Sequence, residues 1–142
     1  MVPMISQTEI DGKPLEKLLN EGKLNKEKLN EIIDRTRKGG GEIVKYLEKG
    51  SAFYAPASAG VEMAESYIKN LKKKLPCAVY LNGEYGVKNL YAGVPVVIGS
   101  KGIEKIIEIK LNKEERANFD TSIESVKELF DAAIKIDPDL KN

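Results

Sequence analysis

The side chains that could carry out acid–base or nucleophilic chemistry near neutral pH are few in this chain. Its 142 residues include no histidine and a single cysteine, Cys77. Histidine is the commonest acid–base group at this pH and the commonest zinc ligand in proteins. A Ser-His-Asp or Cys-His site therefore cannot be assembled from these residues alone. We predict no catalytic residue and no metal site in the chain.

The glycines form no phosphate-binding motif, and the charge suggests no polyanionic partner. Neither G-x-G-x-x-G nor G-x-x-x-x-G-K-[ST] occurs, although these are the loops that hold nucleotide phosphates. The formal net charge is +1, from 23 basic and 22 acidic residues, so no strong field attracts nucleic acid or an acidic membrane. No apolar run approaches the length of a membrane span, and no signal peptide is recognisable. We expect neither nucleic acid nor a membrane as partner.

The composition is that of an ordinary globular domain. Hydrophobic residues make up 42% and charged residues 32% of the chain, and its length suffices for one domain with a core. A lone cysteine cannot form an internal disulfide, so a reducing compartment, the cytoplasm, is expected. Cys77 opens an apolar run and is predicted to be buried as a small hydrophobic residue.

Helical periodicity dominates the first half, after a β-permissive start at Val2–Ile10 that ends in the turn Asp11-Gly12. Apolar spacing predicts three helices, beginning at Pro14, after Asn25 and after Pro56. Gly39–Gly41 interrupt the second helix, so either it breaks there or another segment approaches its backbone closely. Lysines crowd the expected last turns of the third helix, which Pro76 would end (Lys69 and Lys72–Lys74).

The pattern then changes to strands and closes with a long helix. Strands are predicted at Cys77–Leu81, Val94–Ile98 and Ile103–Leu111, with Tyr85–Tyr91 as a possible partner of the first. Asn82-Gly83 signals a tight hairpin, and Pro95 suggests an edge or a strand start. Asn112 and Glu115 form a capping-box variant before an apolar stripe. The members of this stripe are Phe119, Ile123, Val126, Phe130, Ala133 and Ile134. Because strands cluster and do not alternate with helices, the fold class is α+β.

Several stretches together resemble one family. They are Arg35–Val44, Lys49–Ala57, Tyr85–Val87, Val94–Gly99 and Gly102–Ile106. They are similar to the C-terminal domain of the lactate/malate dehydrogenase family, closest to lactate-dehydrogenase-like bacterial malate dehydrogenases. The resemblance runs in register from Met1 to the final helix. It implies helices packed on a small antiparallel sheet, with a long C-terminal helix.

The resemblance also implies which parts of the active site lie elsewhere. Met1-Val2-Pro3 matches the end of the family motif G-G-H-G-D-[ST]-M-V-P. The catalytic histidine would then lie four positions before Met1, and its aspartate, the carboxylate-binding arginines and the NAD-binding domain would lie further upstream. Residues 1–142 are thus expected to form the substrate-side, oligomerising domain, with the N-terminal NAD-binding domain absent and no activity alone.

The family's chemistry supplies further expectations. The complete enzyme would use NAD to interconvert malate and oxaloacetate, a step of the tricarboxylic acid cycle, and no cofactor is expected to bind tightly to this chain alone. Expected partners are these substrates, or lactate and pyruvate, and either further copies of the chain or an N-terminal half. Two alternatives stay open, a non-catalytic oligomerisation or interaction domain and a fragment of an L-lactate dehydrogenase.

Three residues carry the expected contacts with ligands. Ser51 and Ala52 match family positions that line the substrate pocket, and Pro56 matches a cofactor-binding position near the nicotinamide ring. A plainer interpretation is that Ser51-Ala52 opens a helix and that Pro56 lies in its first turn. The sequence departs from the family at Ile5–Thr8, where a proline-arginine pair often stands, so the contacts of this segment are open.

Overall fold

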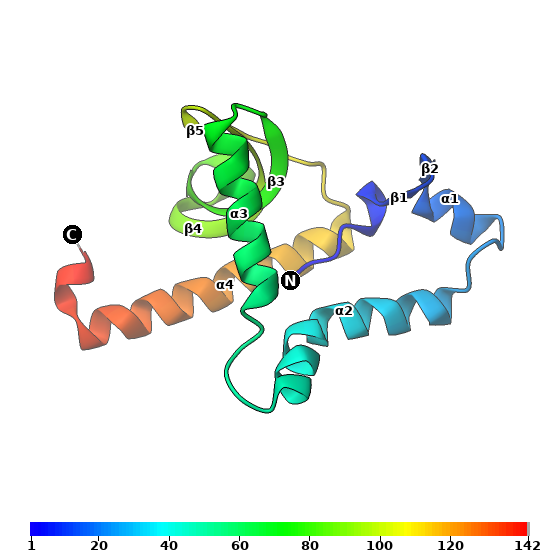
Figure 1. Cartoon of the computed structure of the whole chain (residues 1–142), viewed down its shortest axis with the longest axis horizontal. Helices are drawn as coiled ribbons and strands as arrows, with labels where there is room; N and C mark the ends of the chain where they lie inside the picture. Colours follow the sequence, from blue (N-terminus) through cyan, green and yellow to red (C-terminus); the bar gives the residue numbers. More distant parts are fainter. Residues whose placement is uncertain (142) are drawn as a thin grey trace. The chain divides into compact units, whose positions relative to one another are not determined.

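A computed structural model describes residues 1–141 (Figure 1). The helices are α1 (Leu15–Asn20), α2 (Lys26–Leu47), α3 (Tyr54–Ile68) and α4 (Lys113–Ile136). The strands are β1 (Glu9–Ile10), β2 (Lys13–Pro14), β3 (Lys73–Asn82), β4 (Lys88–Gly99) and β5 (Gly102–Ile106). Short 3₁₀ turns lie at Ile5–Gln7, Glu84–Gly86 and Pro138–Lys141. In this part of the chain no helix is both long and apolar enough to cross a membrane. The predicted α+β class is confirmed.

The chain divides into two compact units. The first comprises Met1–Ala57 and Leu111–Arg116, and the second comprises Ser58–Lys110 and the residues from Ala117 onward. The second unit contains an antiparallel sheet of order β3-β4-β5, and the first contains the hairpin β1-β2. The predicted sheet of three antiparallel strands is confirmed, and the long C-terminal helix is α4.

The central strand β4 carries most of the core of the second unit. Its alternate side chains are buried, as are those facing the same side on β3, because successive residues of a strand point to opposite faces. These buried residues are Leu90, Ala92, Val94, Val96 and Ile98 on β4, with Cys77, Val79 and Leu81 on β3. Leu81 and Val96 are fully buried, at 0% exposure. From α4, Phe119 packs its ring 5.2 Å from that of Tyr85.

Pro95 lies in the middle of the central strand, so the prediction of an edge or a strand start is wrong. It pairs with Pro76 of β3. On the other side β5 ends at Ile106, and the Ile107 N–H donates to the Pro95 carbonyl at 2.8 Å. A central strand tolerates a proline there because the missing N–H points to a place where regular pairing with β5 has already ended.

The hairpin is longer than Asn82-Gly83 suggested. A five-residue connection, Gly83–Val87, joins β3 to β4, and the Gly83 N–H donates to the Val87 carbonyl at 2.8 Å. The Tyr85–Tyr91 and Val94–Ile98 runs are largely one strand, β4, and not two. The third strand ends at Ile106, well before Leu111. Residues after it are held instead by the Tyr85 hydroxyl, which donates to the Ile107 carbonyl (2.6 Å) and accepts from the Ile109 N–H (3.0 Å).

Helix α3 ends earlier than its lysines suggested. It begins two residues before Pro56 and ends at Ile68, and Lys73 and Lys74 belong to β3. The fully buried Ser66 hydroxyl donates to the Ile98 carbonyl at 2.7 Å and accepts from the Lys73 N–H at 3.2 Å. The chain reverses direction between α3 and β3, where Asn70 and Lys72 have positive φ values. The Ser66 hydroxyl thus links α3 to both β3 and β4 at this reversal. Tertiary bonds outweigh the helical pattern here.

The first unit begins with a tight hairpin and a short helix. Asp11 and Gly12, with φ of 51° and 72°, join β1 to β2 as predicted for this turn. Within the β-permissive start Val2–Ile10, the strand is Glu9–Ile10. Helix α1 begins at Leu15, one residue after Pro14, and its Leu15 and Leu18 are buried.

Helix α2 runs without interruption through Gly39–Gly41, so the break, one of the two alternatives, is absent. Asn25 caps it as predicted, since its side chain accepts from the Lys28 N–H at 3.0 Å. No residue of α2 is buried. Within residues 1–141, no atom beyond the helix's own turns and the chain neighbours lies within 4 Å of a Cβ added at any of the three glycines. The close approach expected at these glycines is thus not made by the described part of the chain.

Burial predicts where the fold is most sensitive to truncation. We expect Leu81→Ala to lower the free energy of unfolding by about 2–5 kcal/mol, because a fully buried leucine leaves a cavity. The matched change Leu129→Ala, at a side chain that is 72% exposed, should change it by no more than about 0.5 kcal/mol. Urea unfolding followed by circular dichroism measures both. Equal losses for the two variants would contradict this placement of the core.

Candidate functional site

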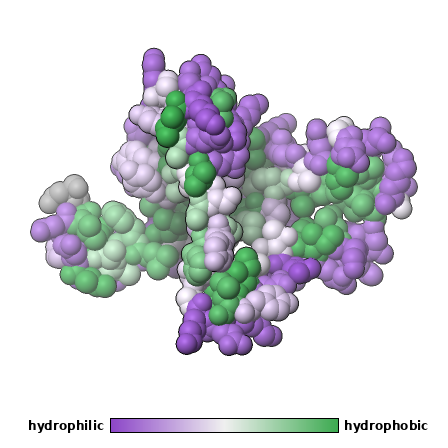
Figure 2. Space-filling model, in the orientation of Figure 1, coloured by the Kyte–Doolittle hydropathy of each residue, from purple (hydrophilic) through white to green (hydrophobic). Residues whose placement is uncertain are grey.

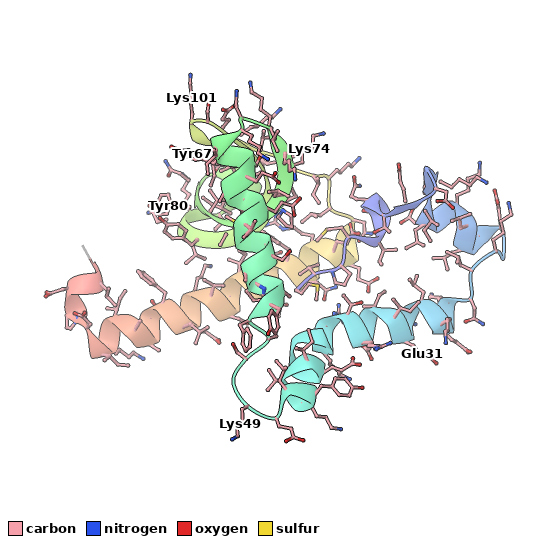
Figure 3. All side chains as sticks on the ribbon, viewed as in Figure 1. Glu31, Lys49, Tyr67, Lys74, Tyr80 and Lys101 are labelled. Atoms are coloured by element: carbon pink, nitrogen blue, oxygen red, sulfur yellow. The ribbon has the colours of Figure 1, made fainter. Side chains whose placement is uncertain are left out.

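The predicted ligand-contacting residues lie on the connection between α2 and α3, which Lys49 marks in Figure 3. Helix α2 ends when Glu48 adopts a left-handed conformation (φ 60°) and donates its N–H to the Val44 carbonyl at 3.0 Å. Gly50 follows with φ 82°, a conformation that favours glycine. These two residues turn the chain out of α2 and toward α3.

Ser51 and Ala52 lie on this connection, and Pro56 lies in the following first turn of α3. Ser51 and Pro56 are exposed and Ala52 is half-buried. The Ser51 carbonyl accepts from the Phe53 N–H at 2.8 Å, but the Ser51 hydroxyl has no hydrogen-bond partner among residues 1–141. Ser51 therefore does not cap α3 through its side chain. Pro56, the third residue of α3, is tolerated because the first N–H groups of a helix have no partner within it.

Aromatic rings stand beside these residues. The Phe53 and Tyr54 rings are 4.6 Å apart, and their exposed fractions are 48% and 72%. A Cβ added at Gly50 would lie 3.6 Å from the Phe53 ring, which is ordinary contact. The connection thus presents an open apolar surface next to a free hydroxyl. Such a surface can bind an organic ligand.

Two opposite charges on α2 are paired with one another. The Arg35 guanidinium donates to both carboxylate oxygens of Glu42, at 2.9 and 3.1 Å. The hydrogen bonds and charge of this pair raise the pKa of Arg35 and lower that of Glu42. Arg35 therefore already has a carboxylate partner.

Cys77 is a free, buried thiol in this fold. Its side chain is 7% exposed on β3, and burial raises the pKa of its thiol. The reactive thiolate is correspondingly scarce near neutral pH. The predicted burial of Cys77 as a small hydrophobic residue is confirmed. Across residues 1–141 no three carboxylate or thiol side chains are grouped so that they could hold a metal ion.

The sequence predicted only part of the polar cluster around Glu115. The predicted capping pair is confirmed, with the Glu115 N–H donating to Asn112 Oδ1 at 2.9 Å and the Asn112 N–H donating to Glu115 Oε2 at 3.0 Å. The same carboxylate also accepts from the Ser6 N–H (2.9 Å) and the Ser6 hydroxyl (2.7 Å). The sequence offered no signal for Ser6, because 109 positions separate the two residues.

Burial alone would raise the pKa of Glu115, which is 4% exposed. The hydrogen bonds from Ser6 and Asn112 outweigh this cost, and the pKa of Glu115 lies below its ordinary value. Glu115 is therefore a charged, fully engaged carboxylate at the start of α4, where the helix dipole also favours negative charge.

Comparison with known proteins places the chain in a family. Residues 1–136 match the sequence profile of the lactate/malate dehydrogenase, alpha/beta C-terminal domain. The malate dehydrogenase of Pelagibacter ubique (strain HTCC1062) is 63% identical over 140 residues, which are 99% of this chain and 44% of that protein. The chain thus spans less than half the length of this relative.

Solved structures agree with the sequence match. The malate dehydrogenase of Cryptosporidium parvum superimposes with a TM-score of 0.86 at 46% identity, over 91% of this chain and 41% of that one. The lactate dehydrogenase of Eimeria maxima, solved with NADH and oxamate, superimposes with a TM-score of 0.90 at 44% identity, over 96% and 42%. The chain therefore belongs to the lactate/malate dehydrogenase family, to the part that forms its C-terminal domain.

Proposed function

We propose that residues 1–142 form the substrate-side, C-terminal domain of an NAD-dependent malate dehydrogenase, which interconverts malate and oxaloacetate by hydride transfer. The observation that carries the proposal is the 63% identity to a malate dehydrogenase over 99% of the chain. A lactate dehydrogenase is the alternative, since one such enzyme is 44% identical over 96% of the chain.

The composition bears on which residues could transfer the proton in such a reaction. Oxidising an alcohol to a ketone requires removal of a hydroxyl proton as the hydride leaves, and NAD supplies the hydride acceptor when bound. The chain has no histidine, and its one thiol is buried. We propose that the proton is transferred by a residue outside these 142 and that this chain contributes only shape and binding.

The connection between α2 and α3 is the surface proposed for that binding. The Ser51 hydroxyl is exposed and has no partner within the described residues, so it can donate to a ligand oxygen. The small Ala52 side chain leaves room for the substrate. Pro56 offers a rigid apolar face, beside exposed aromatic rings, against which a planar nicotinamide could pack.

Complementation tests the proposed activity. We expect no NADH oxidation by the chain alone, and turnover of oxaloacetate when it is mixed with the N-terminal part of the Pelagibacter ubique relative, because the two together supply the missing proton transfer and NAD site. The loss of NADH absorbance measures the rate, and each part alone is the control. Pyruvate turned over in preference to oxaloacetate would favour the lactate alternative. No turnover and no association would reject both.

A larger side chain at Ala52 tests the pocket. In the complemented enzyme we expect Ala52→Leu to lower kcat/KM for oxaloacetate by about tenfold or more, since the added carbons occupy substrate volume. Ala132→Leu makes the same change on the exposed far part of α4 and should leave kcat/KM unchanged. Steady-state kinetics of both variants decide the matter. An unaffected Ala52→Leu enzyme would remove Ala52 from the pocket.

A second candidate function is oligomerisation, which the surface of α2 favours. This 22-residue helix is amphipathic, yet none of its residues is buried. Several large apolar side chains on it are exposed, and Figure 2 shows apolar surface where α2 runs in Figure 1. They are Ile32, Ile43, Val44, Tyr46 and Leu47. An exposed apolar patch of this kind is typical of a protein–protein contact.

Light scattering tests this candidate. We expect the chain to self-associate and Ile32→Lys to weaken the association, because a charge replaces a side chain that is 54% exposed on the apolar face. Glu31→Lys, at the neighbouring position labelled in Figure 3, is the control for introducing a lysine on the same helix. A monomeric wild-type chain at high concentration would contradict the proposal.

A further inference from the structure

The contact between Ser6 and Glu115 joins the first residues of the chain to the start of α4. Glu115 Oε1 accepts from the Ser6 N–H, and Oε2 accepts from both the Ser6 hydroxyl and the Asn112 N–H. The separations lie between 2.7 and 3.0 Å. Charged acceptors that receive several donors in this way make the stronger class of hydrogen bond.

The segment that Ser6 belongs to is itself a closed turn. The Gln7 N–H donates to the Met4 carbonyl at 3.1 Å, and the Thr8 N–H donates to the Ile5 carbonyl at 3.2 Å. The Thr8 hydroxyl also donates to the Met4 carbonyl at 2.7 Å. Because the residues of Met4–Thr8 are hydrogen-bonded to one another, a contact that restrains Ser6 restrains the whole turn. The residues Met1–Pro3 lead directly into this turn.

We propose that Glu115 is a positioning residue: its carboxylate fixes the Met4–Thr8 turn against the start of α4 and so sets the place of the chain that leads into Met1. The inference rests on the proposed function, in which a residue outside these 142 transfers the proton, and on the family resemblance, which implies a catalytic histidine four positions before Met1. Glu115 would then determine, through Ser6, where that histidine meets the substrate. It touches neither substrate nor cofactor itself.

The chemistry of the site requires a carboxylate and not merely a polar side chain. Three donors point at two oxygens, and both oxygens of a carboxylate accept. A glutamine has the same shape but only one accepting oxygen, so its NH₂ group would face an N–H donor. The neighbouring Glu114 is exposed on the same turn. Glu114→Gln therefore changes the charge equally without touching the contact.

Hydrogen exchange on the 142-residue chain tests the contact. In Glu115→Gln we expect the Ser6 amide to exchange about tenfold to a hundredfold faster, the effect of losing a hydrogen bond to a charged group. Amides of β4 should keep their wild-type rates, which separates local release of the turn from general destabilisation. Glu114→Gln should match the wild type at both places. Unchanged exchange at Ser6, or equal acceleration at Ser6 and in β4, would overturn the proposal.

Kinetics of the complemented enzyme test the catalytic consequence. We expect Glu115→Gln to lower kcat by about tenfold to a hundredfold with little change in KM, the pattern of a displaced catalytic group. Glu114→Gln should be indistinguishable from wild type, and a kcat that Glu115→Gln leaves unchanged would overturn the positioning role. If the wild-type mixture shows neither turnover nor association, the proposed function fails and the positioning role fails with it. The exchange experiment then still decides whether Glu115 holds the turn.

Discussion

The second unit of the molecule depends on one constraint, the pairing of β4 on both of its sides. A strand in this position must bury alternate side chains and satisfy its backbone from two neighbours at once. Those side chains supply the core, and the alternation continues onto β3 and is completed by Phe119 of α4. Pro95 illustrates the need to satisfy backbone hydrogen bonds on both sides. It has no N–H to donate, and it lies where the regular pairing with β5 has ended.

The first unit is built differently, and its construction explains why a binding or assembly role suits it. Its long helix α2 has an ordinary cap and an unbroken backbone but buries no side chain. An amphipathic helix normally gains most of its stability from burying its apolar face. A helix that leaves this face open is consistent with a chain that matches only 44% of the length of a relative.

The proposed division of chemistry agrees with this architecture. The connection after α2 offers an exposed serine hydroxyl, a small alanine and exposed aromatic rings, which can shape a pocket. Two charged groups already have partners, since Arg35 is paired with Glu42 and Glu115 accepts from Ser6 and Asn112. The proposed contribution of the chain is therefore to binding and geometry, with the Glu115 carboxylate proposed as a positioning group.

Local patterns in the sequence determined those features whose causes are local. The α+β class, the caps at Asn25 and at Asn112–Glu115, and the Asp11-Gly12 turn depend on a few neighbouring residues, and the structure agrees with each. Only the tertiary structure decided the end of α3, the central place of Pro95 and the second role of Glu115. In each case the deciding hydrogen bond joins residues far apart in the chain, such as Ser66 with Ile98 and Ser6 with Glu115. Periodicity and capping rules describe neighbours along the chain, so they carry no information about a donor 109 positions away.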